Sequence, residues 1–252
     1  EKNVLTVRSD RIPGGAISLL YLEAYCRPGS RDRPWEQTVI GHETTLLHAT
    51  EDKKQITLRC RLKDGVTVAH VITASEGEVD FQLTAHNPTD RPSEAHWAQP
   101  CIRVGRFTGT GADQTDDKYA YITKAFIFLD GRAAFMPTRD WATEARYTPG
   151  QVWVPRGVPR ADANPRPHHP APPDNGLIGC VSAAGKWLCA TAWEPYQELF
   201  QGVIRCLHSD FRIGGLRPGQ SKRIRGKLYV MPNDTAALLR RYRRDFPEQA
   251  GR

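Results

Sequence analysis

The sequence has no long apolar run, and this absence excludes membrane-spanning helices. No stretch approaches the roughly 20 consecutive apolar residues that such a helix needs. Apolar residues make up only 39% of the 252 residues, against 21 glycines and 19 prolines. This composition favours many short strands joined by turns over a helical protein.

Cysteine is sparse and is not spaced for a structural zinc site. The six cysteines include no Cys-x-x-Cys pair, the spacing typical of zinc fingers and ribbons. Four of them lie in or beside apolar stretches, where a free cysteine behaves as a small buried hydrophobe. Cys180 and Cys189 alone are predicted to face each other, across a hairpin whose turn is Ala-Ala-Gly-Lys. The sequence allows two states for this pair, a strained cross-strand disulfide or two free thiols.

Motifs for nucleotide phosphates and nucleic acids are also absent. Gly105, Gly109 and Gly111 punctuate a polar segment, but no Gly-Lys-Ser/Thr and no helix start follow them, so we predict a loop. The net charge of +7 comes without a zinc finger, an RNP-like motif or a lysine-rich arm. We therefore expect a basic solvated surface, or a basic cleft for an acidic partner such as a uronate, and no nucleic-acid partner.

Short strands dominate the part of the chain that periodicity describes best. Residues 56–62 and 66–73 flank Lys-Asp-Gly, and a third strand follows at 79–86. Successive strands this close in sequence form an antiparallel meander, not a β-α-β unit. Residues 176–230 predict four or five more strands, one of which (203–210) ends in the polar sequence Cys-Leu-His-Ser-Asp. Alternation along this strand places Ile204, Cys206, His208 and Asp210 on one face.

Only the C-terminal region carries a helical pattern. Asn233 or Asp234 would cap a helix at residues 234–246, which has one apolar stripe and outward-facing arginines. We therefore predict a single β-sandwich domain over residues 1–252, followed at its end by this helix. The fold class is all-β, an antiparallel sandwich with one C-terminal helix.

A proline-rich segment, residues 155–175, interrupts the strands. It contains seven prolines, which exclude helix and central strand. It is either a disordered surface loop or a stiff flap across the sandwich. A flap would deliver Asn164, Arg166, His168 or His169 to a cleft.

Two stretches resemble the galactose mutarotase-like (aldose 1-epimerase-like) β-supersandwich family of carbohydrate-active proteins. One is a strand with an ionisable group, a loop with Leu-Arg-Pro-Gly at 216–219, and a closing strand. The other is a strand ending in Asn87-Pro-Thr, followed by His96-Trp97 where the family has His-Pro-aromatic. The resemblance covers roughly residues 50–230 and implies a supersandwich fold and carbohydrate chemistry. The chain departs from the family where its catalytic Glu would stand, because Cys-Leu-His-Ser-Asp precedes the loop instead.

His96 and His208 are the strongest candidates for acid-base catalysis. The resemblance places them across one concave sheet, and imidazole titrates near neutral pH. Glu194 or Asp210 would orient or ionise beside them. In a second version, His96, His208 and Glu194 hold a divalent metal, the one cofactor considered. In an extended strand, Trp97, Gln99 and Arg103 share one face and His96 points to the other.

A sugar ring requires aromatic faces bounded by hydrogen-bonding groups. The substrate-binding candidates that meet this description are Trp97, Gln99, Arg103, Arg166, His168, Trp193, Tyr196 and Gln197. An acidic glycan would be clamped by Arg103, Arg166 or Arg205.

The resulting hypothesis is an enzyme acting on a sugar or an acidic glycan by epimerisation, β-elimination or hydrolysis. The alternative is a non-catalytic carbohydrate-binding module, which needs the aromatic and amide side chains but no titrating pair. We expect a periplasmic or secreted protein, with a cytoplasmic one as the alternative, and no membrane partner.

Overall fold

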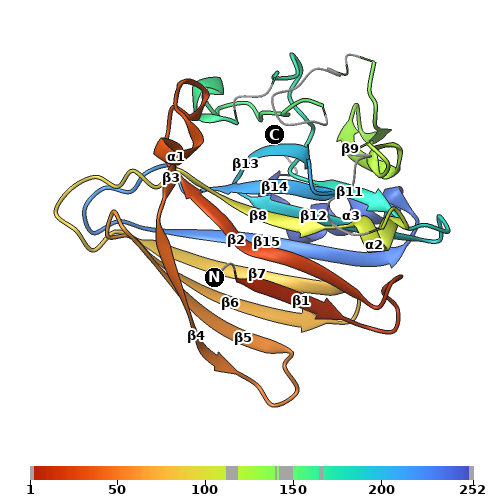
Figure 1. The fold of residues 1–252 in the computed structure, drawn as a ribbon, viewed down its shortest axis with the longest axis horizontal. Helices are drawn as coiled ribbons and strands as arrows, with labels where there is room; N and C mark the ends of the chain where they lie inside the picture. The colour runs from red at the N-terminus through yellow and green to blue at the C-terminus, as the bar shows by residue number, and fades with distance from the viewer. Residues whose placement is uncertain (1–2, 112–118, 140, 142–149, 165–166, 250–252) are drawn as a thin grey trace.

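The computed structural model describes residues 3–111, 119–139, 141, 150–164 and 167–249, which form two antiparallel β-sheets packed face to face (Figure 1). Every pairing between the named strands in these residues is antiparallel. The predicted fold class, an antiparallel β-sandwich with a C-terminal helix, is confirmed. No helix in the described part of the chain is both long and apolar enough to cross a membrane.

The smaller sheet, here called the front sheet, has the strand order β1-β2-β8-β14-β13, and β3 pairs with β2. Its strands are β1 (Val4–Arg8), β2 (Ala16–Cys26), β3 (Val39–Ile40), β8 (Trp97–Arg103), β13 (Tyr196–Gly202) and β14 (Cys206–Arg212).

The larger sheet, the back sheet, has the order β10-β9-β11-β12-β15-β7-β6-β5-β4. Its strands are β4 (His42–Ala49), β5 (Gln55–Leu62), β6 (Thr67–Ser75), β7 (Glu78–His86), β9 (Ala125–Leu129), β10 (Arg132–Phe135), β11 (Ile178–Val181), β12 (Trp187–Glu194) and β15 (Ser221–Pro232).

The predicted meander forms strands β5, β6 and β7 of the back sheet. Alternation along β7 turns Val79, Phe81, Leu83 and Ala85 inward, where all are buried. The turn between β5 and β6 contains Gly65 at a φ of 97°, a conformation that glycine adopts without steric cost. The predicted pairing of Cys180 with Cys189 between β11 and β12 is also confirmed, and both thiols are free.

The sequence analysis named Trp193 as a substrate-binding candidate. Its side chain instead lies in the core between the two sheets. Its ring packs 5.1 Å from Phe81 and 4.9 Å from Phe211, and the residue is 1% exposed. A Cβ atom on Gly226 would stand 2.4 Å from this ring, so glycine leaves the space that the indole occupies. Tyr196, the other aromatic candidate nearby, is buried in the same core.

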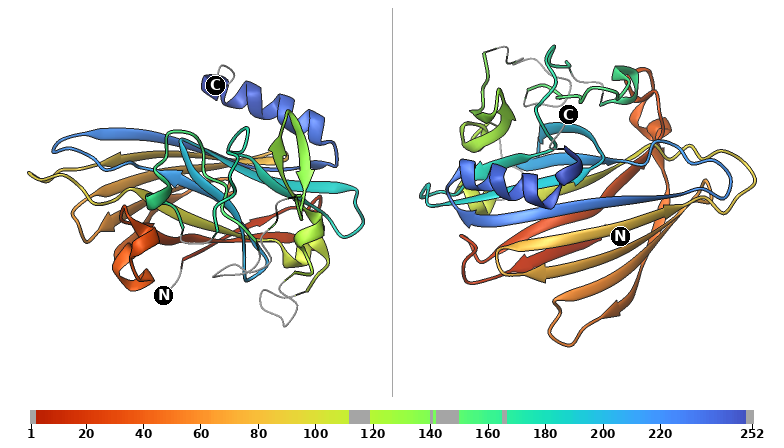
Figure 2. Two further views of the ribbon diagram at one scale, coloured as in Figure 1. Left: turned by 90° about the horizontal axis from the view of Figure 1, so that it is seen from above. Right: turned by 180° about the vertical axis from the view of Figure 1, so that it is seen from behind.

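The C-terminal helix, α3 (Thr235–Asp245), forms as predicted and lies on the outer side of the back sheet (Figure 2). Asp234 caps it by accepting a hydrogen bond from the Ala237 N–H at 2.8 Å. Its apolar stripe packs on side chains of β9, β12 and β15, forming a second core that includes Leu238, Leu239, Tyr242, Phe126 and Tyr229. Shorter helices are α1 (Trp35–Thr38) and α2 (Gly105–Thr108).

Candidate functional site

The outward face of the front sheet carries the polar side chains that the sequence analysis placed together. Leu207 and Phe211 of β14 point into the core between the sheets. Alternation therefore sends Cys206, His208 and Asp210 to the opposite face, as predicted. All three are nevertheless buried, so another part of the chain covers them.

The proline-rich flap (residues 155–175) supplies part of this cover. The Asn164 N–H donates to Glu198 Oε2 of β13 at 2.8 Å, and the Gly29 N–H donates to Asp162 Oδ1 at 2.9 Å. The Ser30 hydroxyl donates to the carbonyl oxygens of Asp162 and Ala163 at 2.6 and 2.8 Å. The described part of the segment therefore matches the flap interpretation.

A cavity of about 180 Å³ opens between the outward face and this cover. Glu23 of β2 and Gln99 of β8 enter it from the sheet, and Asn164 enters from the flap. The complete lining of the cavity is Glu23, Trp35, Gln99, Asn164, Phe200, Gly202, Val203, Ile204, Cys206 and His208.

His208 is held by contacts on three sides. Its Nδ1 lies 3.3 Å from Asp210 Oδ1, and its Nε2 lies 3.3 Å from Cys206 Sγ. Its ring stacks on Phe200, with the centroids 4.2 Å apart and the planes inclined by 7°. The imidazole orientation is therefore fixed, and the buried ring borders the cavity that it lines.

The charges of this group are coupled. Burial lowers the pKa of His208, but the Cys206 thiolate and the Asp210 carboxylate outweigh burial and raise the pKa to about 10. Burial raises the pKa of Cys206, while hydrogen bonding to Cys101 and the charge of His208 bring it well below its usual value. The pKa of Asp210 is raised to about 6, mainly by burial. Both shifts are in the direction that favours a buried thiolate-imidazolium pair of Cys206 and His208.

His96 is not brought next to His208. In the register of β14 with β8, Arg212 lies opposite Trp97, so His96 lies beyond the Arg212 end of the pairing. Four residues of strand separate His208 from Arg212, a span of roughly 13 Å. His96 Nδ1 instead lies 3.7 Å from Asp162 Oδ2, and burial lowers the pKa of His96 although Asp162 opposes this.

The predicted metal set of His96, His208 and Glu194 is not assembled either. Glu194 ends β12 in the back sheet, where it lies opposite Arg225. The described residues that do bring three donor atoms together are Cys101, Cys206 and His208.

Among the substrate-binding candidates that the structure describes, only Gln99 lines the cavity. Trp97 is fully buried in a small cluster with Ala24 and Cys26. Gln197 accepts from Arg212 at 2.6 Å and donates to the Asp162 carbonyl at 3.1 Å, which is a structural role.

The other candidates that the structure describes lie outside the cavity lining. His168 Nε2 contacts the Asn164 carbonyl at 2.9 Å, and Arg103 lies opposite Cys206 in the strand register. Arg205 is not among the residues lining the cavity. Arg166 falls outside the described residues.

Glu23, Trp35 and Phe200 are among the cavity residues that the sequence analysis did not name. Glu23 had a usable signal, because it is the one charged residue in the otherwise apolar stretch of β2 (Ala16–Cys26). A carboxylate in such a strand is costly unless it faces solvent or a site. Trp35 and Phe200 carried no comparable signal.

Comparisons with known proteins gave matches in structure only. No protein-family model and no curated protein sequence matches the chain. A putative aldose 1-epimerase from Escherichia coli K12 shares 12% identity at a TM-score of 0.43, over 75% of this chain and 69% of its own. A galactose mutarotase-like protein from Lactobacillus casei ATCC 334 shares 10% identity at a TM-score of 0.39, over 86% of this chain and 85% of its own. A galactose mutarotase related enzyme from Lactobacillus acidophilus shares 9% identity at a TM-score of 0.44, over 89% of this chain and 86% of its own.

All three structures bear names of the family that the sequence motifs resemble. The fold class assigned here rests on the two antiparallel sheets, and the site is defined by its own geometry.

Proposed function

We propose that this protein is a carbohydrate-active enzyme that binds one sugar ring in the cavity of the front sheet and transfers protons with Glu23 and His208. The observation that carries the proposal is the cavity lining. A carboxylate and an imidazole line the same cavity, together with two amide side chains and two aromatic rings. These are the groups that proton transfer on a polyhydroxylated ring requires.

The amide groups suit sugar hydroxyls. Gln99 and Asn164 are 5% and 4% exposed, so each is held in place by its surroundings. Asn164 Oδ1 is buried and accepts no hydrogen bond from any described residue, so a sugar hydroxyl that reached it would supply the missing donor. Trp35, which is half-buried, offers an aromatic face at the edge of the same space.

The charge of the lining favours a neutral sugar. No Arg or Lys occurs among the described residues that line the cavity, whereas Glu23 contributes a carboxylate. Beside burial, the charge of Glu23 helps to raise the pKa of Asp210, which indicates that these two carboxyl groups lie near each other. A uronate would add a further negative charge, and the lining holds no arginine or lysine to balance it. The acidic-glycan hypothesis therefore receives no support from this cavity.

The size of the cavity favours chemistry on a single ring. Its volume of about 180 Å³ is below the roughly 300 Å³ at which drug-sized ligands begin to fit. Glycan hydrolysis and β-elimination cleave a link between two rings and need room for both. Epimerisation needs one ring, one group that removes a proton and one that returns it, and Glu23 and His208 supply these two roles.

Ligand-detected NMR against a panel of neutral aldoses and matched uronates tests this proposal. A chelator is present throughout because Cys101, Cys206 and His208 could hold a metal ion, and a reductant keeps the two thiols reduced. We expect at least one neutral aldose to bind and to be epimerised, with binding weakened about tenfold or more in Gln99→Ala, by loss of a buried hydrogen bond. Gln82→Ala, an exposed glutamine of the back sheet, is the matched control.

Each other outcome is informative. Binding without epimerisation would identify the carbohydrate-binding module instead. Tight uronate binding would contradict the neutral-sugar assignment, and no binding to either group of sugars would contradict the proposal as a whole.

A further inference from the structure

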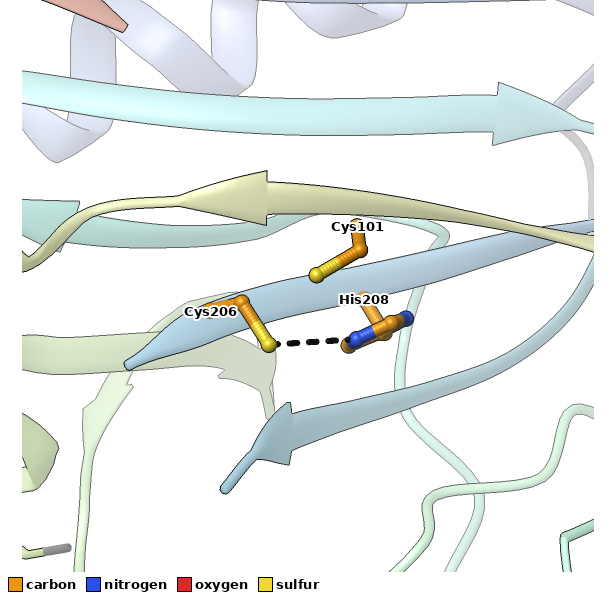
Figure 3. A group of neighbouring side chains, drawn as sticks. All are labelled: Cys101, Cys206 and His208. Atoms are coloured by element: carbon orange, nitrogen blue, oxygen red, sulfur yellow. Dashed lines mark hydrogen bonds between the residues drawn. The ribbon is translucent and has the colours of Figure 1, made fainter. Parts of the chain in front are cut away.

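Three side chains of types that can ligate a metal ion lie close together beside the cavity, and two of them, Cys206 and His208, line it. The donor atoms of Cys101, Cys206 and His208 lie within 4.8 Å of one another, and all three residues are buried. Figure 3 shows the two thiols and the imidazole grouped on one side of the front sheet, Cys101 from β8 and the other two from β14. Strand alternation at i and i+2 brings Cys206 and His208 together, and sheet pairing adds Cys101.

The spacing matches a tetrahedral metal site. With Zn–S bonds of about 2.3 Å and Zn–N bonds of about 2.0 Å, two ligand atoms of one tetrahedron lie about 3.6 Å apart. Cys206 Sγ and His208 Nε2 are 3.3 Å apart. A Cβ atom on Gly202 would stand 2.2 Å from Cys206 Sγ and 3.2 Å from His208 Nε2, so glycine leaves free the space beside both ligands.

The surroundings of His208 also match those of a metal ligand. A histidine bound to a metal through one nitrogen usually donates its other N–H to a carboxylate, which fixes the ring and strengthens the bond. Asp210 Oδ1 lies 3.3 Å from His208 Nδ1 in this position. Asp210 is fully buried, and its Oδ2 has no hydrogen-bond partner among the described residues.

We propose that Cys101, Cys206 and His208 bind one Zn²⁺ ion through two thiolates and Nε2, with the fourth coordination position facing the cavity. Soft thiolate ligands select zinc over magnesium or calcium. Cys206 and His208 both line the cavity, so a water or sugar hydroxyl can reach the ion. Two thiolates balance the charge of the ion, and two protons, one from Cys101 and one from the Cys206-His208 pair, pass to solvent on binding.

The zinc site is separate from the proposed proton transfer, and an ion bound there would inhibit it. Nε2 of His208 cannot hold zinc and a transferable proton at the same time. Zinc binding therefore removes the proton-transferring imidazole, and the chelated and zinc-loaded proteins differ in activity. Binding of the ion needs no sugar, so the two proposals fail independently.

Titration with Co²⁺, a spectroscopic substitute for zinc, tests the site without any activity assay. The protein is reduced, stripped with chelator and exchanged into metal-free buffer. We expect a thiolate-to-cobalt charge-transfer band in the near ultraviolet that saturates at one equivalent and disappears when one equivalent of Zn²⁺ is added. Cys101→Ser and Cys206→Ser should lose the band, whereas Cys60→Ser, a buried cysteine of the back sheet, should retain it.

Asp210→Asn separates a positioning role from a purely structural one. It keeps the size of the side chain, and the circular dichroism spectrum reports whether the variant folds. We expect its Zn²⁺ affinity, measured by competition with a chelating dye, to fall about 10- to 100-fold while the cobalt band keeps its stoichiometry. A wild-type protein without the charge-transfer band, or a Cys206→Ser variant that keeps it, would overturn the proposal.

Discussion

His70 makes the stability of the fold depend on pH, and the structure determines the direction. This residue of β6 is fully buried, with Nδ1 2.8 Å from the Tyr21 hydroxyl and Nε2 3.3 Å from the Tyr25 hydroxyl. A neutral imidazole satisfies both tyrosines, one as donor and one as acceptor. Burial, helped by the charge of nearby His42, lowers the pKa of His70 from 6.5 to about 3. The other titratable group packed against the tyrosines is Cys60.

The magnitude follows from this shift. Between pH 6.5 and pH 3 the unfolded chain binds a proton at His70 that the folded chain does not, so the free energy of unfolding falls as the pH falls. Each pH unit in that window costs about 1.4 kcal/mol. Lowering the pH from 7 to 4.5 should therefore remove about 2.7 kcal/mol through this residue alone. Above pH 6.5 the contribution of His70 to stability no longer changes.

Urea unfolding at several pH values measures the effect. We expect His70→Gln to be less stable than the wild type at pH 7, because glutamine satisfies the tyrosines less well, but to lose less stability on acidification. The difference in free energy of unfolding between the wild type and His70→Gln should change by about 2.7 kcal/mol in favour of the variant from pH 7 to pH 4.5. All other titrating groups are common to the two proteins, so their contributions cancel. His48→Gln, at an exposed position of β4, should follow the wild-type curve. Parallel curves for the wild type and His70→Gln would refute the reasoning.

Three further substitutions test the core, the C-terminal helix and the hydrogen bonds of Asp162. Gly226→Ala should destabilise the fold by about 1–3 kcal/mol in urea unfolding, because the new Cβ would meet the Trp193 ring at 2.4 Å; unchanged stability would show that the core can yield there. Asp234→Ala should cost about 1 kcal/mol by removing the cap of α3, and equal melting curves would contradict that role. Asp162→Asn should weaken sugar binding with intact secondary structure, because its carboxylate accepts from Gly29 and Arg212; calorimetric affinities equal to those of the wild type would separate this network from the site.

Local patterns predicted the features that depend on a single strand or turn. The face shared by Cys206, His208 and Asp210 follows from the two-residue period of β14, because one side of that strand packs in the core. The cap at Asp234 follows from side-chain chemistry next to an apolar stripe.

Features that depend on distant pairing could not be predicted in the same way. Glu23 reaches the site because β2 pairs with β8, and Asn164 does so because the flap bonds to β13. The separation of His96 from His208 is a matter of sheet register. Trp193 was misplaced because both faces of β12 are buried, one by the sandwich core and one by α3, so alternation carries no signal there.

The rate of sugar epimerisation in Glu23→Gln, measured by NMR exchange with chelator present, tests the central claim most directly. The substitution keeps size and hydrogen bonding but removes the proton-accepting carboxylate. The account predicts that kcat falls about 100-fold or more with little change in melting temperature, and that Glu43→Gln, at an exposed position of β4, behaves like the wild type. Undiminished turnover in Glu23→Gln would contradict the assignment of this cavity as the active site.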